Sequence, residues 1–346
     1  NGGTDAEDAS STDTAQKYLD TTSAGSGMYV MTSYIPDQEI VLEKNENYWG
    51  ESTNVDKYII KIQPDSNTQM MTLSSGDIDV AMNMTDDTMA ELEGNENVTL
   101  INAATKTVGF LMMNMNEQYG GPVSDPKVQQ AIRKAMDYTG VQTICGAGTV
   151  TPYSVIQSGF MGSKGERPAG YTNLEEAKAL LAEAGYPDGF DLVIRVPDNY
   201  KPHESTAEII VESLKEVGIN ATIQLDEFSS WVEEVYTGRD FQATIVAVDG
   251  TLSPGSWLEK NPSDAPKNFT NYSNAEFDET YAAALATVDD DEKVELYKKC
   301  QMILAEDAAS VYIQDAANLV AVNEKLDGYV FYPCAAQDMS GVHFVE

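Results

Sequence analysis

Two runs near the start of the chain decide its fold: Gly25-Ser26-Gly27-Met28-Tyr29-Val30 and Val41-Leu42-Glu43-Lys44-Asn45-Glu46-Asn47-Tyr48-Trp49-Gly50. Residues 29–34 and 39–43 have the composition of strands, and they flank the turn residues Pro36-Asp37-Gln38. This arrangement predicts a β-hairpin.

Strand and helix patterns alternate after this hairpin. The first part of the chain predicts a strand at 57–62, a helix at 66–74 that ends at Gly76, a short strand at 77–81 and a helix at 86–92. Such alternation favours an α/β fold.

The rest of the chain carries stronger helix signals and a repeated α/β pattern. After an apolar strand at 108–114, Asp125 is a helix cap and Pro126 takes the first helical position. Asn173 begins another capped helix, closed by Gly185. Residues 139–170 are expected to be mostly loop. A βαβαβ unit is predicted from strand 190–197, helix 204–217, strand 219–227, helix 229–237 and strand 241–248. A long loop at 249–271, helices at 274–286 and 290–306, and strands at 309–314, 318–322 and 328–332 complete the prediction.

Composition limits the function. A chain of 346 residues favours two domains. Its net charge of −35, from 56 acidic against 21 basic residues, argues against nucleic acid or an anionic membrane surface as a partner, since both would repel it. The scarce cations Arg195 and Arg239 are predicted to form surface salt bridges, although either could meet a ligand carboxylate. No apolar run reaches membrane-spanning length.

Metal, cofactor and enzyme motifs are also missing from the sequence. The three cysteines, Cys145, Cys300 and Cys334, have no C-x-x-C spacing, and the H-E-x-x-H motif that His203 could begin has Ala207 at its last position. There is no G-x-S-x-G, P-loop or G-x-G-x-x-G motif. We therefore expect no metal, no cofactor and no catalysis, with a hydrolase as the disfavoured alternative.

The opening runs resemble the signature "G-S/T-G-P-Y … L-x-R/K-N-x-x-Y-W-G" of the family 5 extracellular solute-binding proteins, the peptide and nickel receptors of ABC importers. Four later segments resemble the same family in the same order: residues 74–79, 121–132, 177–190 and 296–308. The resemblance spans residues 25–346.

This resemblance implies a two-lobed α/β clam of the periplasmic-binding-protein type (type II, cluster C-like), with ligand held between the lobes. Residues 22–107 with 315–346 would form lobe I, 108–314 a complete lobe II, and 1–21 a linker-like segment. Because the signature begins near residue 25, the chain is expected to lack the N-terminal part of the family. The first lobe would then be incomplete, with unpaired strand edges.

Four residues are candidate ligand contacts. In peptide-binding relatives an Asp after a second-lobe strand pairs with the ligand ammonium, and Asp249 is its counterpart here. Asp249 lies one residue further from Pro254 than the family pattern, and the pattern's Trp is absent. Its alternative role is to form a turn before glycine. Trp231, Trp257 and Tyr312 are the other candidates, and each could instead pack in the core or at the hinge.

The expected function is an extracytoplasmic receptor that captures peptides by hinge closure and delivers them to an ABC permease. It would be a cell-surface lipoprotein or periplasmic, touching the membrane only through a lipid anchor outside this chain. An oligosaccharide or other polar solute stays open as the ligand, since Trp231 and Trp257 could stack on sugars. A peptide-sensing or chaperone-like receptor without a transporter stays open as well.

Overall fold

The computed structural model describes residues 8–19, 22–50, 54–146, 148–167, 171–198, 201–251, 253–307, 310–332 and 338–345. The chain divides into two compact units, residues 1–101 with 319–346 and residues 102–318. Two long strands, β5 (Val98–Met113) and β9 (Ser310–Asn323), run from one unit into the other. The prediction of an α/β protein in two parts is confirmed.

Unit 1 contains the hairpin that the opening runs predicted. Strands β1 and β2 pair antiparallel, with Asp37 in the left-handed region at the turn (φ 58°), and β3 adds a third strand beside β2. Helix α3 begins at the cap Asp65 and ends at Gly76 (φ 80°), as predicted. The elements of unit 1 besides β5 and β9 are α1 (Ala9–Thr12), α2 (Gln16–Leu19), β1 (Tyr29–Ile35), β2 (Glu39–Lys44), β3 (Lys57–Lys61), α3 (Ser66–Ser75), β4 (Val80–Ala81), α4 (Asp86–Leu92), β10 (Leu326–Asp327) and β11 (His343–Phe344).

Unit 2 is built on the six-stranded sheet of order β4-β9-β5-β8-β6-β7, whose strand β4 belongs to unit 1. Strands β6, β7 and β8 are parallel and form the predicted βαβαβ unit, while β5 pairs antiparallel with β8. The elements of unit 2 besides β5 and β9 are α5 (Glu117–Gly120), the 3₁₀ turn η1 (Gly121–Ser124), α6 (Pro126–Ala135), α7 (Tyr138–Cys145), α8 (Leu174–Glu183), β6 (Asp191–Pro197), α9 (Lys201–Lys215), β7 (Asn220–Asp226), α10 (Phe228–Trp231), the π-helix η2 (Val232–Thr237), β8 (Ala243–Asp249), α11 (Gly255–Leu258), α12 (Ala275–Ala286) and α13 (Asp290–Asp307).

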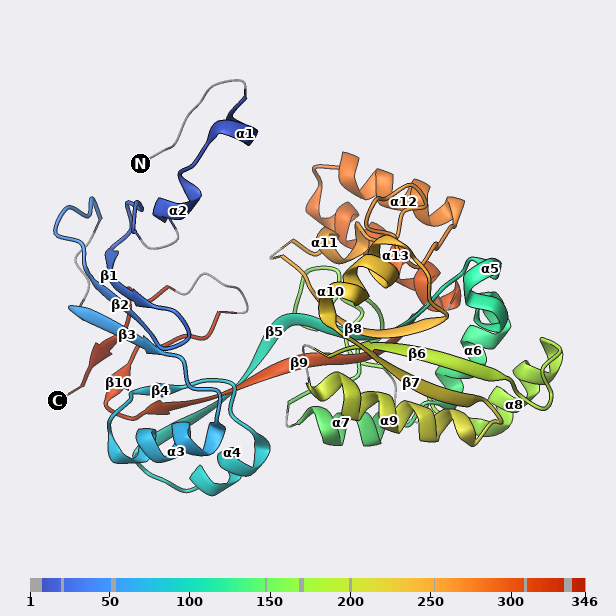
Figure 1. The fold of residues 1–346 in the computed structure, drawn as a ribbon, viewed down its shortest axis with the longest axis horizontal. Helices are drawn as coiled ribbons and strands as arrows, with labels where there is room; N and C mark the ends of the chain where they lie inside the picture. The colour runs from blue at the N-terminus through green and yellow to red at the C-terminus, as the bar shows by residue number, and fades with distance from the viewer. Residues whose placement is uncertain are drawn as a thin grey trace. The chain divides into compact units, whose positions relative to one another are not determined.

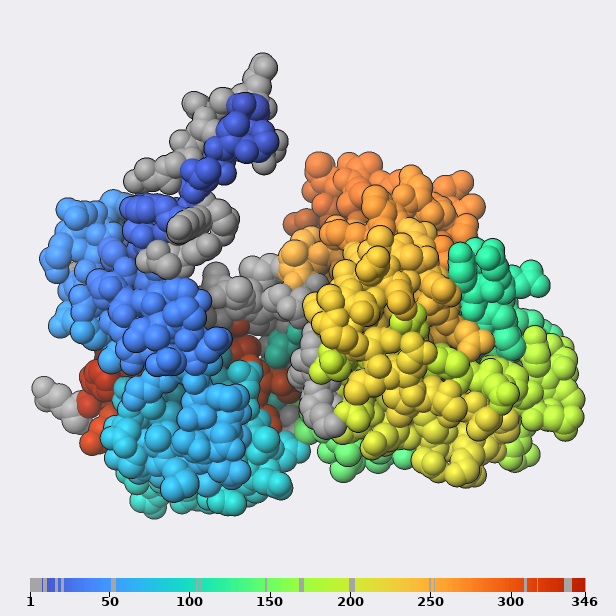
Figure 2. Space-filling view, viewed as in Figure 1, coloured from blue at the N-terminus to red at the C-terminus, as the bar shows by residue number. Residues whose placement is uncertain are grey.

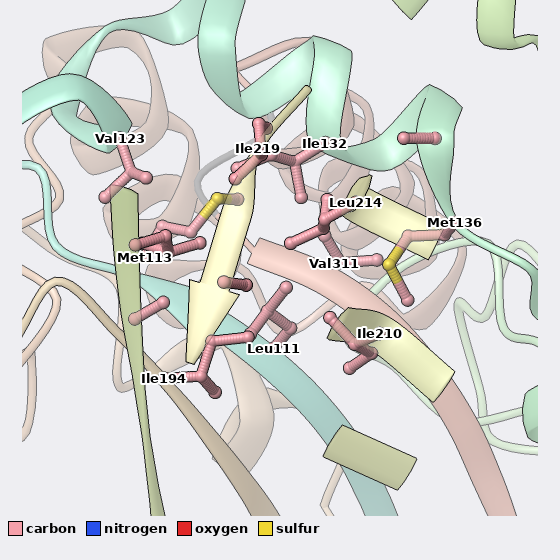
Figure 3. Packing of buried hydrophobic residues seen from close by; sticks show 14 of the residues in the cluster. Leu111, Met113, Val123, Ile132, Met136, Ile194, Ile210, Leu214, Ile219 and Val311 are labelled. Carbon is pink, nitrogen blue, oxygen red and sulfur yellow. The ribbon is translucent and has the colours of Figure 1, made fainter. Parts of the chain in front are cut away.

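Helices cover both faces of this sheet. Residues of α6, α7, α8 and α9 pack on one face in an aliphatic core, and residues of α10, α11, α12 and α13 pack on the other in an aromatic core (Figure 1). Alternate residues of β5 enter opposite cores, because successive side chains of a strand point to opposite faces. Leu111 and Met113 lie in the aliphatic core, which Figure 3 shows from close by, and Phe110 and Met112 lie in the aromatic one. The segment from β7 to α13, yellow to orange in Figure 2, forms much of the outer surface of unit 2 on the side shown.

Two secondary-structure predictions were wrong. Residues 310–323 form the single strand β9, because the extended backbone continues through residues 315–317, which separated the two predicted strands. No strand occurs at 328–332; instead β10 ends at Asp327 and pairs with β11 near the chain end. The segment 139–170 is mostly loop, as predicted, although helix α7 overlaps its beginning, since Asp137 caps that helix and Val141 is fully buried.

Other predictions fall partly or wholly outside the described residues. Of the linker-like segment 1–21, only residues 8–19 are described, and they hold the two single-turn helices α1 and α2. Cys334 lies outside the described residues, whereas Cys145 and Cys300 are free thiols.

Candidate functional site

Asp249 is the last residue of β8, at the point where the chain leaves the centre of the unit 2 sheet. Its backbone pairs with Thr107 of β5. The side chain of Asp249 lies outside the described part of the structure. The next residue, Gly250, is buried against the indole ring of Trp257: a Cβ at Gly250 would lie 2.1 Å from Cε2 of that ring. Only glycine fits there without displacing the tryptophan, so the direction of the chain after Asp249 is set by this contact.

Replacing Gly250 by alanine should therefore destabilise unit 2. The added methyl group overlaps a ring that is itself fully buried, and we expect a loss of about 1–3 kcal/mol in the free energy of unfolding. Urea denaturation measures the effect. Gly27→Ala is the matched control, because nothing lies within 4 Å of a Cβ at Gly27. Equal stability of the two variants would contradict the packing argument.

Trp257 and Tyr312 line one small cavity within unit 2. Trp257 is 1% exposed and meets the Phe160 ring edge-on at 4.8 Å. Tyr312 is 3% exposed and meets the Phe110 ring edge-on at 5.6 Å. The cavity has a free volume of about 20 Å³, enough for a water molecule or two. Its lining consists of Phe110, Met112, Val155, Val248, Trp257, Lys260, Asn261, Lys267, Phe269, Thr270, Ser310 and Tyr312.

Trp231 does not line this cavity. It closes α10 at 4% exposure, its Nε1 donates to Thr244 Oγ1 at 3.0 Å, and its ring meets Phe269 edge-on at 6.3 Å. Because Phe269 does line the cavity, Trp231 stands one side chain behind it. The structure thus brings Trp257 and Tyr312 together, places Asp249 next to the glycine under Trp257, and keeps Trp231 in the aromatic core.

Sequence reasoning missed the polar side of this cavity. Lys260, Asn261 and Lys267 all come from the loop region 249–271, in which only Asp249 and Trp257 were candidates. Lys267 forms an ion pair with Glu259 at 2.8 Å, and this hydrogen-bonded partner raises the lysine pKa. The available signal was the pair Lys260 and Lys267, two basic residues seven positions apart in a chain that is rich in acids.

The two arginines that were considered for ligand contact have structural partners. Arg195 is buried at 7% exposure, not on the surface as predicted, and its guanidinium binds Asp226 at 2.7 Å and Glu234 at 2.6 Å. Arg239 donates from Nη1 to Asn271 Oδ1 at 3.0 Å.

No group of three or more His, Cys, Asp and Glu side chains that could hold a metal ion occurs among the described residues. Burial lowers the pKa of His203 to about 4, so its imidazole is neutral. Within the same ranges, no helix combines the length and apolar character that a bilayer crossing requires.

Comparison with known proteins agrees with this architecture. A family model described as "Bacterial extracellular solute-binding proteins, family 5 Middle" matches residues 4–269. Heme-binding protein A of Haemophilus influenzae is 27% identical over 338 residues, which are 94% of this chain and 60% of that protein. "Probable D,D-dipeptide-binding periplasmic protein DdpA" of Escherichia coli is 27% identical over 337 residues, 94% of this chain and 63% of the relative. The chain therefore spans about three fifths of the length of these curated relatives.

Solved structures show the same fold. The substrate-binding protein CtaP of Listeria monocytogenes matches 97% of this chain and 70% of its own, with a TM-score of 0.83 at 20% identity. The periplasmic binding protein DppA of Helicobacter pylori, in complex with the peptide STSA, matches 92% of this chain and 63% of its own, with a TM-score of 0.76 at 24% identity. They confirm the predicted periplasmic-binding-protein-like α/β fold. Since the family model covers more than half of the sequence, this chain belongs to the bacterial extracellular solute-binding proteins of family 5, which bind a solute and do not transform it.

Proposed function

We propose that this chain is the solute-capturing part of an extracytoplasmic receptor that binds peptides and passes them to an ABC permease. Capture involves no chemistry and uses closure about β5 and β9, the two strands that continue from one unit into the other. Several relatives support the peptide class by name, including a dipeptide-binding protein of Escherichia coli that is 23% identical and covers 94% of this chain.

The observation that carries the proposal is the position of Asp249. It ends a central strand of the unit 2 sheet, and open α/β sheets bind ligands at the carboxyl ends of their strands. The packing of Gly250 on Trp257 fixes the backbone at this point. A carboxylate held by a fixed backbone is suited to pair with the ammonium group at the N-terminus of a peptide.

Calorimetry on the chain tests the proposal with a mixture of short peptides, the same peptides N-acetylated, and a mixture of oligosaccharides. We expect binding to the free peptides and at least tenfold weaker binding after acetylation, about 1.4 kcal/mol. Binding of oligosaccharides alone would replace peptides with sugars as the ligand class.

Replacing Asp249 by asparagine tests the anchor itself. The substitution keeps the size of the side chain but removes its charge, so peptide affinity should fall at least tenfold, about 1.4 kcal/mol. Asp264→Asn is the control, since Asp264 is an exposed acid in the same loop region. Equal affinity of the two variants would remove Asp249 from the site.

The place of the receptor in the cell follows from the same proposal. The family is described as extracellular. We infer attachment at the cell surface through a lipid outside this chain, or a periplasmic location. The permease is the membrane partner, and the net charge of −35 argues against nucleic acid as a partner.

A further inference from the structure

Phe228, the first residue of α10, has an aromatic ring that unit 2 leaves in contact with solvent. It is 43% exposed, which makes it the most exposed aromatic side chain among the described residues of unit 2. Its ring stacks on the ring of Trp231, with the centroids 6.3 Å apart and 8° between the planes. Trp231 is buried. The ring of α10 that a ligand can meet is therefore Phe228, and Trp231, the candidate named from the sequence, packs behind it.

Phe228 lies at the sheet edge where open α/β sheets bind their ligands, two residues after the carboxyl end of β7. Asp249 ends β8, and the order β8-β6-β7 puts one strand between the two. Neighbouring strands are about 4.8 Å apart, and β8 continues past the level of Asp226, so these strand ends are separated by about 10–14 Å. Three or four residues of extended peptide span that distance, at about 3.4 Å each. A short peptide held at Asp249 can thus reach Phe228.

Two acidic residues fix the backbone at Phe228. Asp198, just beyond β6, accepts a hydrogen bond to Oδ1 from Phe228 N at 3.1 Å. Glu227 accepts hydrogen bonds from the Ser229 hydroxyl and, at 3.3 Å, from Ser230 N, and these bonds lower the pKa of Glu227. Both acids are exposed, and neither forms an ion pair in the ranges that the structure describes. The exposed ring is accordingly bordered by two carboxylates that no cation of the protein neutralises.

We propose that Phe228 is the contact for a basic side chain of the peptide, lysine or arginine, with Asp198 and Glu227 as its counter-charges. A cation is attracted to the face of an aromatic ring, and nearby carboxylates add to that attraction. An apolar ligand side chain gains only from the ring, so charge complementarity favours a basic one. The inference rests on the proposed function, since Asp249 holds the N-terminus of the same peptide.

Calorimetry on the whole chain tests this contact with tetra-alanine peptides that carry one substitution. Lysine is placed in turn at positions two, three and four, and norleucine, which has a similar length but no charge, is the matched side chain. At position three or four we expect the lysine peptide to bind about fivefold more tightly than its norleucine counterpart. The preference should shrink in about 0.5 M NaCl, because salt screens exposed charges.

Variants of Phe228 separate this contact from the general attraction of an acidic protein for cations. Phe228→Leu keeps an apolar side chain but removes the ring, so the preference for lysine should fall below about twofold. Phe228→Tyr should keep the preference, and so should Leu285→Ala, an exposed substitution on α12. Glu227→Gln keeps an oxygen for the hydrogen bonds but removes the charge, and it should weaken the preference.

The outcomes distinguish this inference from the proposed function. If peptides bind but lysine and norleucine peptides bind equally well at every position, the basic contact is wrong and the peptide receptor stands. An unchanged preference for lysine in Phe228→Leu would likewise overturn the role of Phe228. If no peptide of either series binds, the proposed function and this inference fall together.

Discussion

Replacing Trp257 by alanine should lower the free energy of unfolding of unit 2 by about 3–5 kcal/mol. The ring is 1% exposed and belongs to the aromatic core, where it meets Phe160 and covers Gly250. Truncation removes the largest fully buried side chain of the described residues and leaves a cavity that the rigid β8 and α11 backbones cannot fill by relaxing.

Urea denaturation followed by Trp231 fluorescence measures this loss. A Trp49→Phe background removes the signal from unit 1, and Trp231 then reports unit 2. The matched control in the same background is Leu285→Ala, since that side chain of unit 2 is 61% exposed and should contribute less than about 0.5 kcal/mol. If Trp257→Ala lowers the free energy of unfolding by less than about 1 kcal/mol, the ring contributes little to core packing and is free to turn toward a ligand.

Replacing Arg195 by methionine should lower the free energy of unfolding by about 3–5 kcal/mol, because it leaves the buried carboxylate of Asp226 without its cation. Arg195 donates to both carboxylate oxygens of Asp226, at 2.7 and 2.9 Å, and to Glu234 at 2.6 Å. It also donates to the backbone oxygen of Asp240 at 3.1 Å. Methionine matches the length of the side chain but offers none of these donors.

The pH dependence identifies the cause. Burial raises the pKa of Asp226, but the hydrogen bonds and charge of Arg195 outweigh burial, so the folded-state pKa lies below its usual value of 3.8. In wild type this pair stabilises the fold above that unfolded-state pKa and ceases to do so as pH falls through the folded pKa. Without Arg195, burial is opposed only by the hydrogen bond that Gln224 Nε2 donates to Asp226 Oδ1 at 2.9 Å. We expect the pKa of Asp226 to rise above 3.8, so that the variant loses stability as pH rises.

Denaturation at pH 4 and pH 7 checks this expectation. The free energy of unfolding that Arg195→Met loses relative to wild type should be larger at pH 7 than at pH 4. The double variant, Arg195→Met with Asp226→Asn, should recover part of that loss. Lys215→Met is the control, because its pair with Glu212 at 3.3 Å is exposed and should contribute less than about 1 kcal/mol. A deficit that is the same at both pH values would assign the effect to packing alone.

Elements with local signals could be predicted from the sequence. Asp125 with Pro126 and Asn173 cap α6 and α8 as expected, because a cap depends on residues within one helical turn. The continuity of β9 and the pairing of β10 with β11 could not be predicted in the same way. Both depend on partners far away in the sequence, so no local pattern records them.

The candidate site could likewise be predicted only in part from the sequence. Trp257 and Tyr312 were chosen by residue type and segment, and the structure places both on one cavity. Their near-complete burial depends on residues far away in the sequence, such as Phe160 against Trp257 and Phe110 against Tyr312. Asp315 of β9 was not singled out, because its hydrogen bonds with Val150 and with Ser158 N join residues that only the tertiary structure brings together.

The opening runs around Gly25–Gly50 and the four later segments determined the family and the α/β class by themselves. Each of these patterns consists of neighbouring residues, so it can be recognised in the sequence without the structure. Only the tertiary structure decided that Arg195 is buried between two acids and that Gly250 lies under Trp257. Burial, ion pairing and the shared surroundings of distant residues are properties of side chains from several elements at once, and a single segment cannot specify them.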